Sequence, residues 1–228
     1  MASPQPGLSR FYLLLGGLAV VGVGVLVYLA TGRGAVSIPA NVTVLPADTA
    51  GFRGYLIGSP DAPVEIAEYA DFQCPGCAAF ATIQWPDVKS RLIDTGRLRW
   101  RYRDFPLDQI HPYARLASHA AACGDEQGRF LEVADRIYAG QSSWFSGGAE
   151  GAFRGYAQAA GLDLGRYDEC MQSARYAGRI QASLDEGVRL GVGSTPTFLV
   201  NGRLYTDGLN YDQIRRLVDS LAPLPATP

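Results

Sequence analysis

Two cysteines separated by two residues, Cys74 and Cys77, form the part of the chain best suited to chemistry. They follow an apolar run, residues 64–70, which predicts a strand, and they precede residues 78–93, which predict a helix. Thiols at this spacing on the first turn of a helix can close a disulfide with little backbone movement. The helix N-terminus also stabilises the thiolate of the first cysteine. The pattern therefore predicts dithiol–disulfide exchange and favours an enzyme.

A zinc knuckle or a purely structural disulfide is the alternative use of this pair. Structural zinc sites need four Cys or His ligands, typically from two close pairs. The other cysteines, Cys123 and Cys170, lie far apart in the sequence, and the two histidines, His111 and His119, have no useful spacing to them. We therefore prefer redox chemistry to metal binding, and we predict neither a metal nor an organic cofactor.

Composition limits the class of protein. The 228 residues suffice for one good-sized domain with additional segments. The net charge of −2 and the scattered arginines provide no basic surface for nucleic acid. Four cysteines, an even number, fit an oxidising compartment outside the cytoplasm.

The N-terminal region contains an uncharged apolar stretch, Phe11 to Ala30, long enough to span a bilayer as a helix. The residues after it, Thr31 to Gly34, make a poor cleavage site, so the stretch predicts a transmembrane signal anchor instead of a cleaved signal peptide. Residues 1–10 would then be a cytoplasmic stub, residues 31–50 a linker, and residues 51–228 a domain on the extracytoplasmic side of a bacterial cell membrane. A buried core helix is the less favoured alternative, because the stretch is uniformly apolar and lies at the start of the chain.

The remaining elements predict an α/β architecture. Short strands are predicted within residues 42–45 and 51–58. Residues 97–103 alternate arginine with apolar side chains and predict a strand with one solvated face; such a row could also bind anions, but the alternation alone explains it. Pro86 is expected to kink the helix that follows Cys77. Helices are predicted at residues 111–123, 126–138, 151–160, 163–172, 174–190 and 212–221, and Asn201-Gly202 predicts a hairpin between residues 197–200 and 203–205.

The order of these elements is strand, Cys-x-x-Cys helix, strand, helical block, hairpin and helix. Without the helical block it reads βαβ followed by ββα. The sequence therefore predicts a thioredoxin fold with a helical insertion at about residues 107–190, preceded by one transmembrane helix.

Three motifs in this order resemble those of the DsbA-like thiol–disulfide oxidoreductases, specifically their membrane-anchored members. The resemblance covers roughly Gly54 to Leu221. It is carried by residues 71–77 (Asp-Phe-Gln-Cys-Pro-Gly-Cys), residues 121–130 around Cys123, and residues 193–202 (Gly-Ser-Thr-Pro-Thr-Phe-Leu-Val-Asn-Gly).

The resemblance implies roles for several residues. Pro196 would form a cis peptide bond and pack against the disulfide, which leaves the backbone of Thr195 free to pair with an extended substrate. Glu68, on an otherwise apolar strand face, would exchange protons with Cys77. Cys74 would be the exposed sulfur of low pKa and Cys77 the buried one. The resemblance also implies exported protein substrates with free thiols, a monomer, and reoxidation by a quinone-linked membrane enzyme of the DsbB or vitamin K epoxide reductase-like type.

Cys123 and Cys170 both fall in the helical block. We expect a structural disulfide that clamps this block, with a second redox pair as the alternative.

Two departures from the family pattern leave the direction of reaction open. Gly76 occupies the position where a histidine is common, and a threonine before the proline also occurs in disulfide isomerases. The competing functions are a reductase or isomerase of the same fold, and a non-enzymatic binding module whose Cys-x-x-Cys pair is structural.

Overall fold

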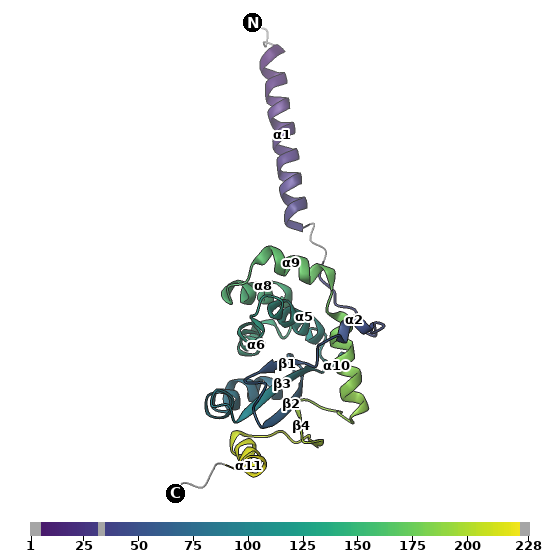
Figure 1. Ribbon diagram of the computed structural model, residues 1–228. Helices are drawn as coiled ribbons and strands as arrows, with labels where there is room; N and C mark the ends of the chain where they lie inside the picture. The colour runs from purple at the N-terminus through teal and green to yellow at the C-terminus, as the bar shows by residue number, and fades with distance from the viewer. Residues whose placement is uncertain (1–5, 32–34, 224–228) are drawn as a thin grey trace. The chain divides into compact units, whose positions relative to one another are not determined.

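The computed structural model describes residues 6–31 and 35–223, with side chains for residues 11–25 and 35–223. The chain divides into two compact units, residues 1–36 and 37–228. The first contains helix α1 (Pro6–Thr31) (Figure 1). Residues 1–5 of the predicted stub and residues 32–34 of the predicted linker lie outside the described residues. The side chains of residues 6–10 of the stub also lie outside the described part of the chain.

The transmembrane anchor predicted at Phe11 to Ala30 is not supported. Residues 26–30 of this stretch lie beyond the described side chains of α1. Among the described residues, no helix has the length and the apolar character needed to cross a membrane.

The second unit is built on a five-stranded sheet in the order β1-β3-β2-β4-β5. The strands are β1 (Tyr55–Ile57), β2 (Val64–Ala70), β3 (Leu98–Asp104), β4 (Thr197–Val200) and β5 (Arg203–Tyr205). β2 and β3 are parallel, and the other pairs are antiparallel. The parallel βαβ unit followed by an antiparallel hairpin confirms the predicted thioredoxin fold. The strand predicted at residues 42–45 is wrong: these residues form no strand and lead into the short helix α2 (Pro46–Thr49). Just before them, the Asn41 backbone N–H donates to the Gln181 side chain of α10 and not to a strand edge.

One face of the sheet is covered by the segments α3 (Pro75–Ala79), η1 (Phe80–Gln84), α4 (Trp85–Val88) and η2 (Lys89–Ile93), together with α11 (Tyr211–Leu221). Buried apolar residues of these helices pack on Ile66, Trp100 and Phe198 of the three central strands. Pro86 has no N–H to donate to the preceding turn, and the π-helical turn η1 ends just before it. What the structure shows around Pro86, where a kink is predicted, is a widening of the helix into the π-helical turns η1 and η2.

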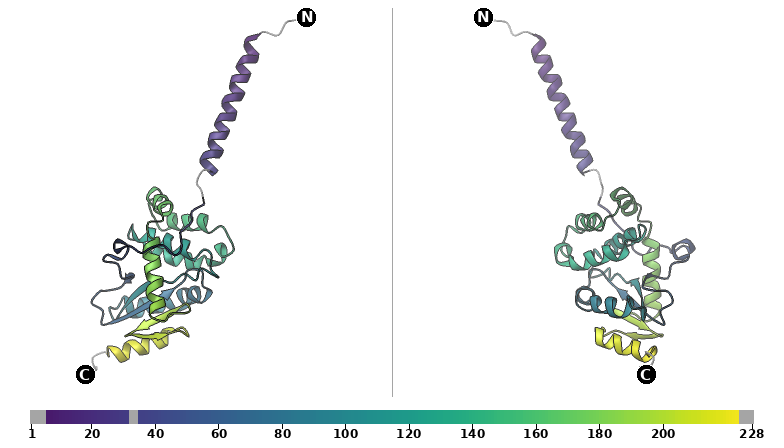
Figure 2. Two further views of the ribbon diagram at one scale, coloured as in Figure 1. Left: turned by 90° about the vertical axis from the view of Figure 1, so that its right-hand side faces the viewer. Right: turned by 60° about the vertical axis from the view of Figure 1, so that its left-hand side comes forward.

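The predicted helical insertion is confirmed. Helices α5 (Ala114–Asp125), α6 (Phe130–Ala139), α7 (Gln141–Trp144), α8 (Ala149–Ala159) and α9 (Leu164–Ser173) follow β3. Helix α10 (Ala177–Arg189) returns along the other face of the sheet, beside the strands in both views of Figure 2. A side chain at Gly187 would lie 2.7 Å from the Phe105 ring, so a glycine here permits this close approach.

The face of β3 that carries its arginines was predicted to be solvated, and this prediction is wrong for its C-terminal end. Arg103 is only 8% exposed. Helix α10 covers it, and Glu186 of that helix forms an ion pair with Arg103. Alternation along one strand identifies the face but not the helix that later covers it.

Candidate active site

Cys74 and Cys77 lie at the start of the helical segment that follows β2. Cys74 is the N-cap residue of α3, in extended conformation, and Cys77 lies one turn further along. Both are free thiols. Among the described residues, the only group of His, Cys, Asp or Glu side chains close enough to hold a metal lies elsewhere, so the pair has no further ligands for the zinc-knuckle alternative.

The two sulfurs differ in accessibility and acidity. Cys77 is fully buried, whereas Cys74 is 9% exposed, less than the exposed nucleophile predicted. A hydrogen bond from the Cys77 thiol is the main cause that lowers the pKa of Cys74 to about 5; the Thr195 side chain and the backbone N–H groups of Cys77 and Gly76 also lower it, against burial. Burial, and then the neighbouring Cys74 sulfur, raise the pKa of Cys77 well above its usual value. The thiolate form of Cys74 is therefore favoured at the helix start, and the buried Cys77 thiol donates a hydrogen bond to it.

The loop before β4 closes over the pair. Its Thr195–Pro196 peptide bond is cis. The Cys74 sulfur lies 3.3 Å from the Thr195 carbonyl oxygen, to which the thiol can donate. A groove of about 590 Å³ runs beside this contact, and its lining includes Gly76, Ile83, Thr195 and Pro196. The structure thus brings the first motif, residues 71–77, and the third, residues 193–202, into direct contact.

Glu68 lies on β2, the strand that leads to the cysteines, and is 5% exposed. Trp100 Nε1 donates to its Oε2 at 3.0 Å. Burial raises the pKa of Glu68 to about 8, so the group is protonated at neutral pH. Its charge in turn contributes to the raised pKa of Cys77, which places the two titrating groups within electrostatic reach of each other.

Several residues that hold the site received no role in the sequence analysis. Gln141 of α7 donates from Nε2 to the carbonyl oxygens of Phe72 and Cys74, at 2.9 and 3.1 Å. The helical insertion therefore holds the backbone of Cys74, the N-cap residue of α3, in place. Nothing in the sequence around Gln141 indicates this contact, because it joins residues 67 positions apart.

Asp71 and Gln73, inside the first motif, fix the loop that enters α3. Asp71 Oδ2 accepts from the Leu107 backbone N–H and contacts His111 Nδ1 at 2.8 Å, while its Oδ1 accepts from the Gln73 backbone N–H. Buried polar side chains beside a Cys-x-x-Cys pair could have indicated this role, because buried carboxylates need partners. His111, considered above only as a metal ligand, is such a partner.

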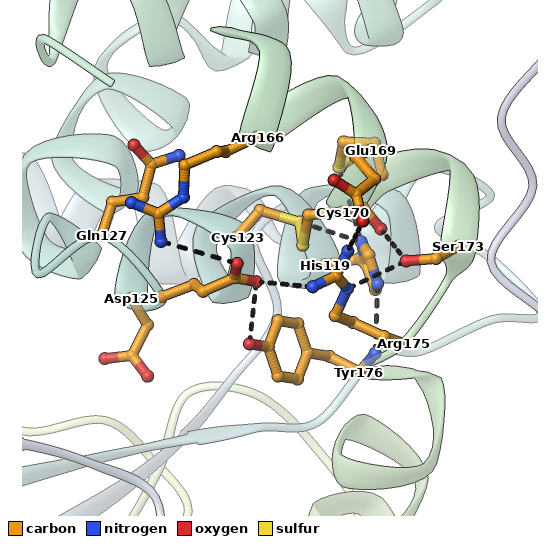
Figure 3. Close-up of a disulfide and its surroundings, with 12 residues drawn as sticks. His119, Cys123, Asp125, Gln127, Arg166, Glu169, Cys170, Ser173, Arg175 and Tyr176 are labelled. Atoms are coloured by element: carbon orange, nitrogen blue, oxygen red, sulfur yellow. Dashed lines mark hydrogen bonds and ion pairs between the residues drawn. A yellow bond between two sulfur atoms is a disulfide. The ribbon is translucent and has the colours of Figure 1, made fainter. Parts of the chain in front are cut away.

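Cys123 and Cys170 form a disulfide between α5 and α9 (Figure 3). Both residues are 1% exposed. His119 lies one turn before Cys123, with its Nδ1 3.4 Å from the Cys123 sulfur. The expectation that neither histidine has a useful spacing to these cysteines is therefore wrong for His119, because residues four apart share one face of a helix. His119 Nε2 accepts from the Tyr176 N–H, and burial lowers the pKa of His119 to about 4, so the neutral ring directs its Nδ1–H toward sulfur.

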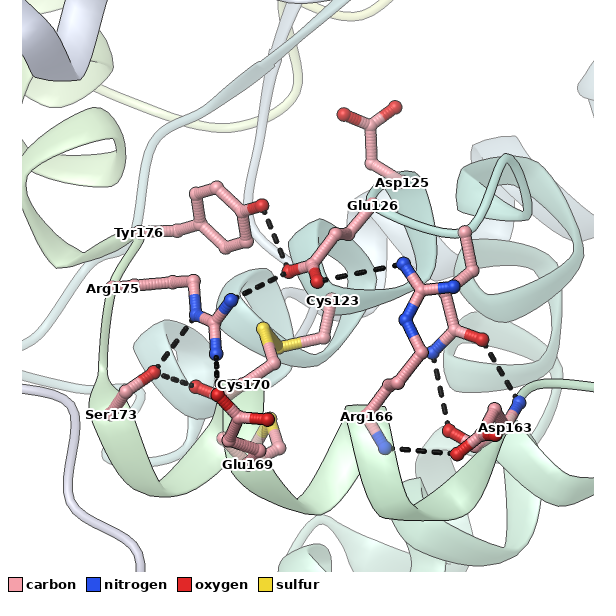
Figure 4. Close-up of polar contacts among 12 residues, drawn as sticks. Cys123, Asp125, Glu126, Asp163, Arg166, Glu169, Cys170, Ser173, Arg175 and Tyr176 are labelled. Carbon is pink, nitrogen blue, oxygen red and sulfur yellow. Dashed lines mark hydrogen bonds and ion pairs between the residues drawn. A yellow bond between two sulfur atoms is a disulfide. The ribbon is translucent and has the colours of Figure 1, made fainter.

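A polar network covers this disulfide. Glu126 accepts from the Tyr176 hydroxyl at 3.0 Å and pairs with Arg175 and Arg166 (Figure 4). These contacts join the end of α5 to α9 and to the start of α10, across the same junction as the disulfide. Covalent bond and network together hold the insertion as one body.

Comparison with known proteins finds relatives for the part of the chain that contains this site. A family model described as thioredoxin matches residues 53–220. Among curated proteins, a Na(+)/H(+) antiporter NhaA 3 of Salinispora tropica is 36% identical over 168 residues, which are 74% of this chain and 24% of that protein. An antiporter NhaA 1 of Mycobacterium sp. (strain KMS) is 32% identical over 155 residues, 66% of this chain and 24% of that protein. The chain therefore spans about a quarter of the length of the curated relatives it matches.

Solved structures of DsbA type share the fold. Chlamydia trachomatis DsbA aligns with a TM-score of 0.68 at 22% identity, covering 83% of this chain and all of that one (100%). Oxidised BdbD from Bacillus subtilis aligns with a TM-score of 0.66 at 20% identity, over 73% of this chain and 91% of that one. At these identities the likeness establishes the fold.

Proposed function

We propose that this chain, which belongs to the thioredoxin family, is a thiol–disulfide oxidoreductase that introduces disulfides into exported proteins. The observation that carries the proposal is the asymmetry of the Cys74–Cys77 pair: the pKa of Cys74 is lowered to about 5, and that of Cys77 is raised. A thiolate stabilised in the reduced form makes the disulfide form the better oxidant. The buried Cys123–Cys170 disulfide supports a location in an oxidising, extracytoplasmic compartment.

The reaction follows from the position of each sulfur. A substrate thiolate attacks Cys74 Sγ of the oxidised enzyme, the Cys74–Cys77 bond breaks, and a mixed disulfide forms. Cys77 leaves as a thiolate in a buried site, and the protonated carboxyl of Glu68 can supply its proton. A second substrate thiolate then attacks the substrate sulfur of the mixed disulfide and displaces Cys74 as a stabilised thiolate. Two substrate thiols are thereby oxidised, and one enzyme disulfide is reduced.

The groove beside Thr195 and Pro196 is the proposed binding site for the substrate chain. The Thr195 carbonyl faces Cys74, so an extended peptide that pairs with this loop would bring its cysteine to the reactive sulfur. The exposed side chain of Ile83 in the same groove favours an apolar residue next to that cysteine. The reduced pair would pass its two electrons to a membrane-bound, quinone-linked reoxidase of the DsbB or vitamin K epoxide reductase-like type.

Trapping of substrates tests the assignment of the two sulfurs. Cys77→Ser should accumulate mixed disulfides with exported proteins, because its Cys74 thiolate can still attack a protein disulfide and no Cys77 thiol remains to displace the bound protein, while Cys74→Ser should accumulate none. The Cys74→Ser/Cys77→Ser double variant is the control for capture through the other cysteines. Absence of trapped species in Cys77→Ser, in cells where the wild type oxidises substrates, would show that the roles are assigned wrongly.

The reduction potential of the Cys74–Cys77 couple, from equilibrium with a glutathione buffer, tests the direction of the reaction. We expect a value nearer to the about −120 mV of strong oxidants than to the about −270 mV of thioredoxin. A value at the thioredoxin end would identify a reductase.

A further inference from the structure

A second cleft, of about 570 Å³, lies on the face of the sheet away from the cysteine helix. Glu65, Ala67 and Tyr69 of β2 line it, and these alternate with Ile66 and Glu68, which face the other side. Arg101 and Arg103 of β3 continue its floor. Helix α10 and the segment at residues 44–53 form its sides. Figure 1 shows α2, within that segment, next to α10.

Positive charge predominates in this arginine cleft. It is lined by five arginines and three acids: Arg53, Arg101, Arg103, Arg179 and Arg189, against Glu65, Asp185 and Glu186. Each acid already has a partner. Glu65 accepts from Arg99 and Arg101, Asp185 accepts from Gln181, and Glu186 pairs with Arg103. Among the described residues, Arg53 and Arg189 have no acidic partner.

Unpaired donors are buried in the same cleft. Arg103 Nε, Arg179 Nε and Ser183 Oγ are buried and have no hydrogen-bond partner among the described residues. Arg103 is 8% exposed and Ser183 2%. Two acids outside the lining of the cleft act on these arginines: the charge of buried Asp104 interacts with Arg103 and Arg179, and Asp125 pairs with Arg179 Nη1 at 3.6 Å. The Nε atoms of both arginines remain without an acceptor. Buried donors without acceptors are unfavourable unless a ligand supplies the acceptors. The donors lining the cleft therefore match a ligand that is rich in oxygen acceptors.

Packing holds two of these arginines in place. Arg179 lies over the Phe52 ring, 4.0 Å from its centroid, and over the Tyr176 ring, 4.4 Å from its centroid. Gly54, with φ +103°, lets the chain pass directly against β3: a Cβ there would lie 2.6 Å from Arg103 Cδ. The cleft is thus bounded by fixed backbone and stacked side chains, and its donors are preorganised.

We propose that the arginine cleft is a binding site for a small organic oxyanion, a carboxylate or a phosphate. Guanidinium groups bind the oxygens of both groups, and the volume is that of a small-molecule site. Phe52, Tyr69 and Leu199 supply apolar contact for the carbon part of such a ligand. The site is separate from the cysteine pair, so its occupancy does not depend on the redox proposal.

Titration of the full chain with inorganic phosphate and with citrate, at constant ionic strength set by sodium chloride, tests this proposal. Calorimetry and thermal unfolding both report binding without using enzyme activity. We expect saturable binding and a raised Tm with at least one of the two anions, and the stronger of the two identifies the ligand class.

Variants locate the binding. Arg179→Gln should weaken the affinity at least about tenfold, the effect of losing one charge-assisted hydrogen bond. Ser183→Ala, which removes an unpaired hydroxyl, and Arg189→Gln, at the exposed end of α10, should weaken it without disturbing the fold. Arg91→Gln, an exposed arginine outside the cleft, is the matched control and should bind as the wild type does. No saturable binding of either anion to the wild type, or equal affinity in all variants, would overturn the proposal.

Discussion

The chemistry of this protein depends on where a few side chains lie along the strand and helix that meet at Cys74. Cys74 is at a helix start, beside backbone N–H groups and the Cys77 thiol, and its pKa falls to about 5. Cys77, three residues further on, has no exposed surface, and its pKa rises. The thiol group is therefore a stabilised thiolate, and so a good leaving group, at Cys74, whereas at Cys77 it stays protonated.

Gly76 is the residue at which the oxidising power should be adjustable. A Cβ at this position would lie 3.7 Å from Cys74 Sγ and 3.4 Å from Pro196 Cδ, so a side chain fits there and reaches the sulfur. Gly76→His should lower the Cys74 pKa and raise the reduction potential by at least about 30 mV, the equivalent of one charge-assisted contact of about 1.4 kcal/mol. Equilibration with glutathione measures it, with Gly76→Ala as the control for the added Cβ. An unchanged or more reducing potential would show that residue 76 does not set the potential.

Glu68 should make the protein less stable as pH rises. Its pKa is raised from 4.5 to about 8, so between these values the unfolded chain releases a proton that the folded chain keeps. The free energy of unfolding should fall across this range by up to about 1.4 kcal/mol per pH unit. Glu68→Gln should remove this slope in urea unfolding experiments and should slow displacement of Cys77.

Glu65 provides the matched control on the same strand. Hydrogen bonds from Arg101 are the main cause that lowers its pKa to about 2, so its stabilisation is complete above pH 4.5 and is lost only as pH falls toward 2. Glu65→Gln should therefore reduce stability equally at pH 5 and pH 8. A slope that persists in Glu68→Gln would assign the pH dependence to another group.

At the scale of elements, the helical insertion depends on the bond between α5 and α9. The Cys123–Cys170 bond closes a loop of 47 residues, for which the chain-entropy model gives about 4 kcal/mol. Cys123→Ala/Cys170→Ala should lower the Tm and leave most of the thiol–disulfide exchange activity at low temperature, because neither residue lines the groove at Cys74.

Thermal unfolding together with a thiol-oxidation assay checks this expectation. Cys123→Ala and Cys170→Ala as single variants separate loss of the bond from the effect of one unpaired thiol. Equal stability of the double variant, or loss of turnover in a fully folded one, would favour the second-redox-pair alternative.

For the whole molecule, the redox state of one pair should change global stability. The reduced protein contains the stabilised Cys74 thiolate and should unfold at a higher temperature than the oxidised protein. Because the pKa of Cys74 is lowered from 9.0 to about 5, this stabilisation is complete above pH 9 and is lost as pH falls through 5.

The difference in Tm between the two redox states should therefore narrow from pH 7 to pH 5. Calorimetry of both forms at each pH measures it. Cys74→Ser has no thiolate at this position and cannot form the disulfide, so its single Tm should lack the loss that the reduced wild type shows between pH 7 and pH 5. A Tm difference that stays constant with pH would mean that the Cys74 thiolate is not what stabilises the reduced form relative to the oxidised form.

Local patterns in the sequence determined much of this protein. The Cys-x-x-Cys pair, the strand at residues 64–70, the hairpin at Asn201-Gly202 and the helical insertion depend on neighbouring residues, and the thioredoxin fold followed from their order. Tertiary structure decided what depends on contacts between distant segments. Gln141 holds the Cys74 carbonyl, α10 covers Arg103, and Trp100 bonds the carboxyl of Glu68. Alternation along a strand distinguishes its two faces, but which helix covers a face, and therefore which charges are buried there, is set by packing between elements far apart in the chain.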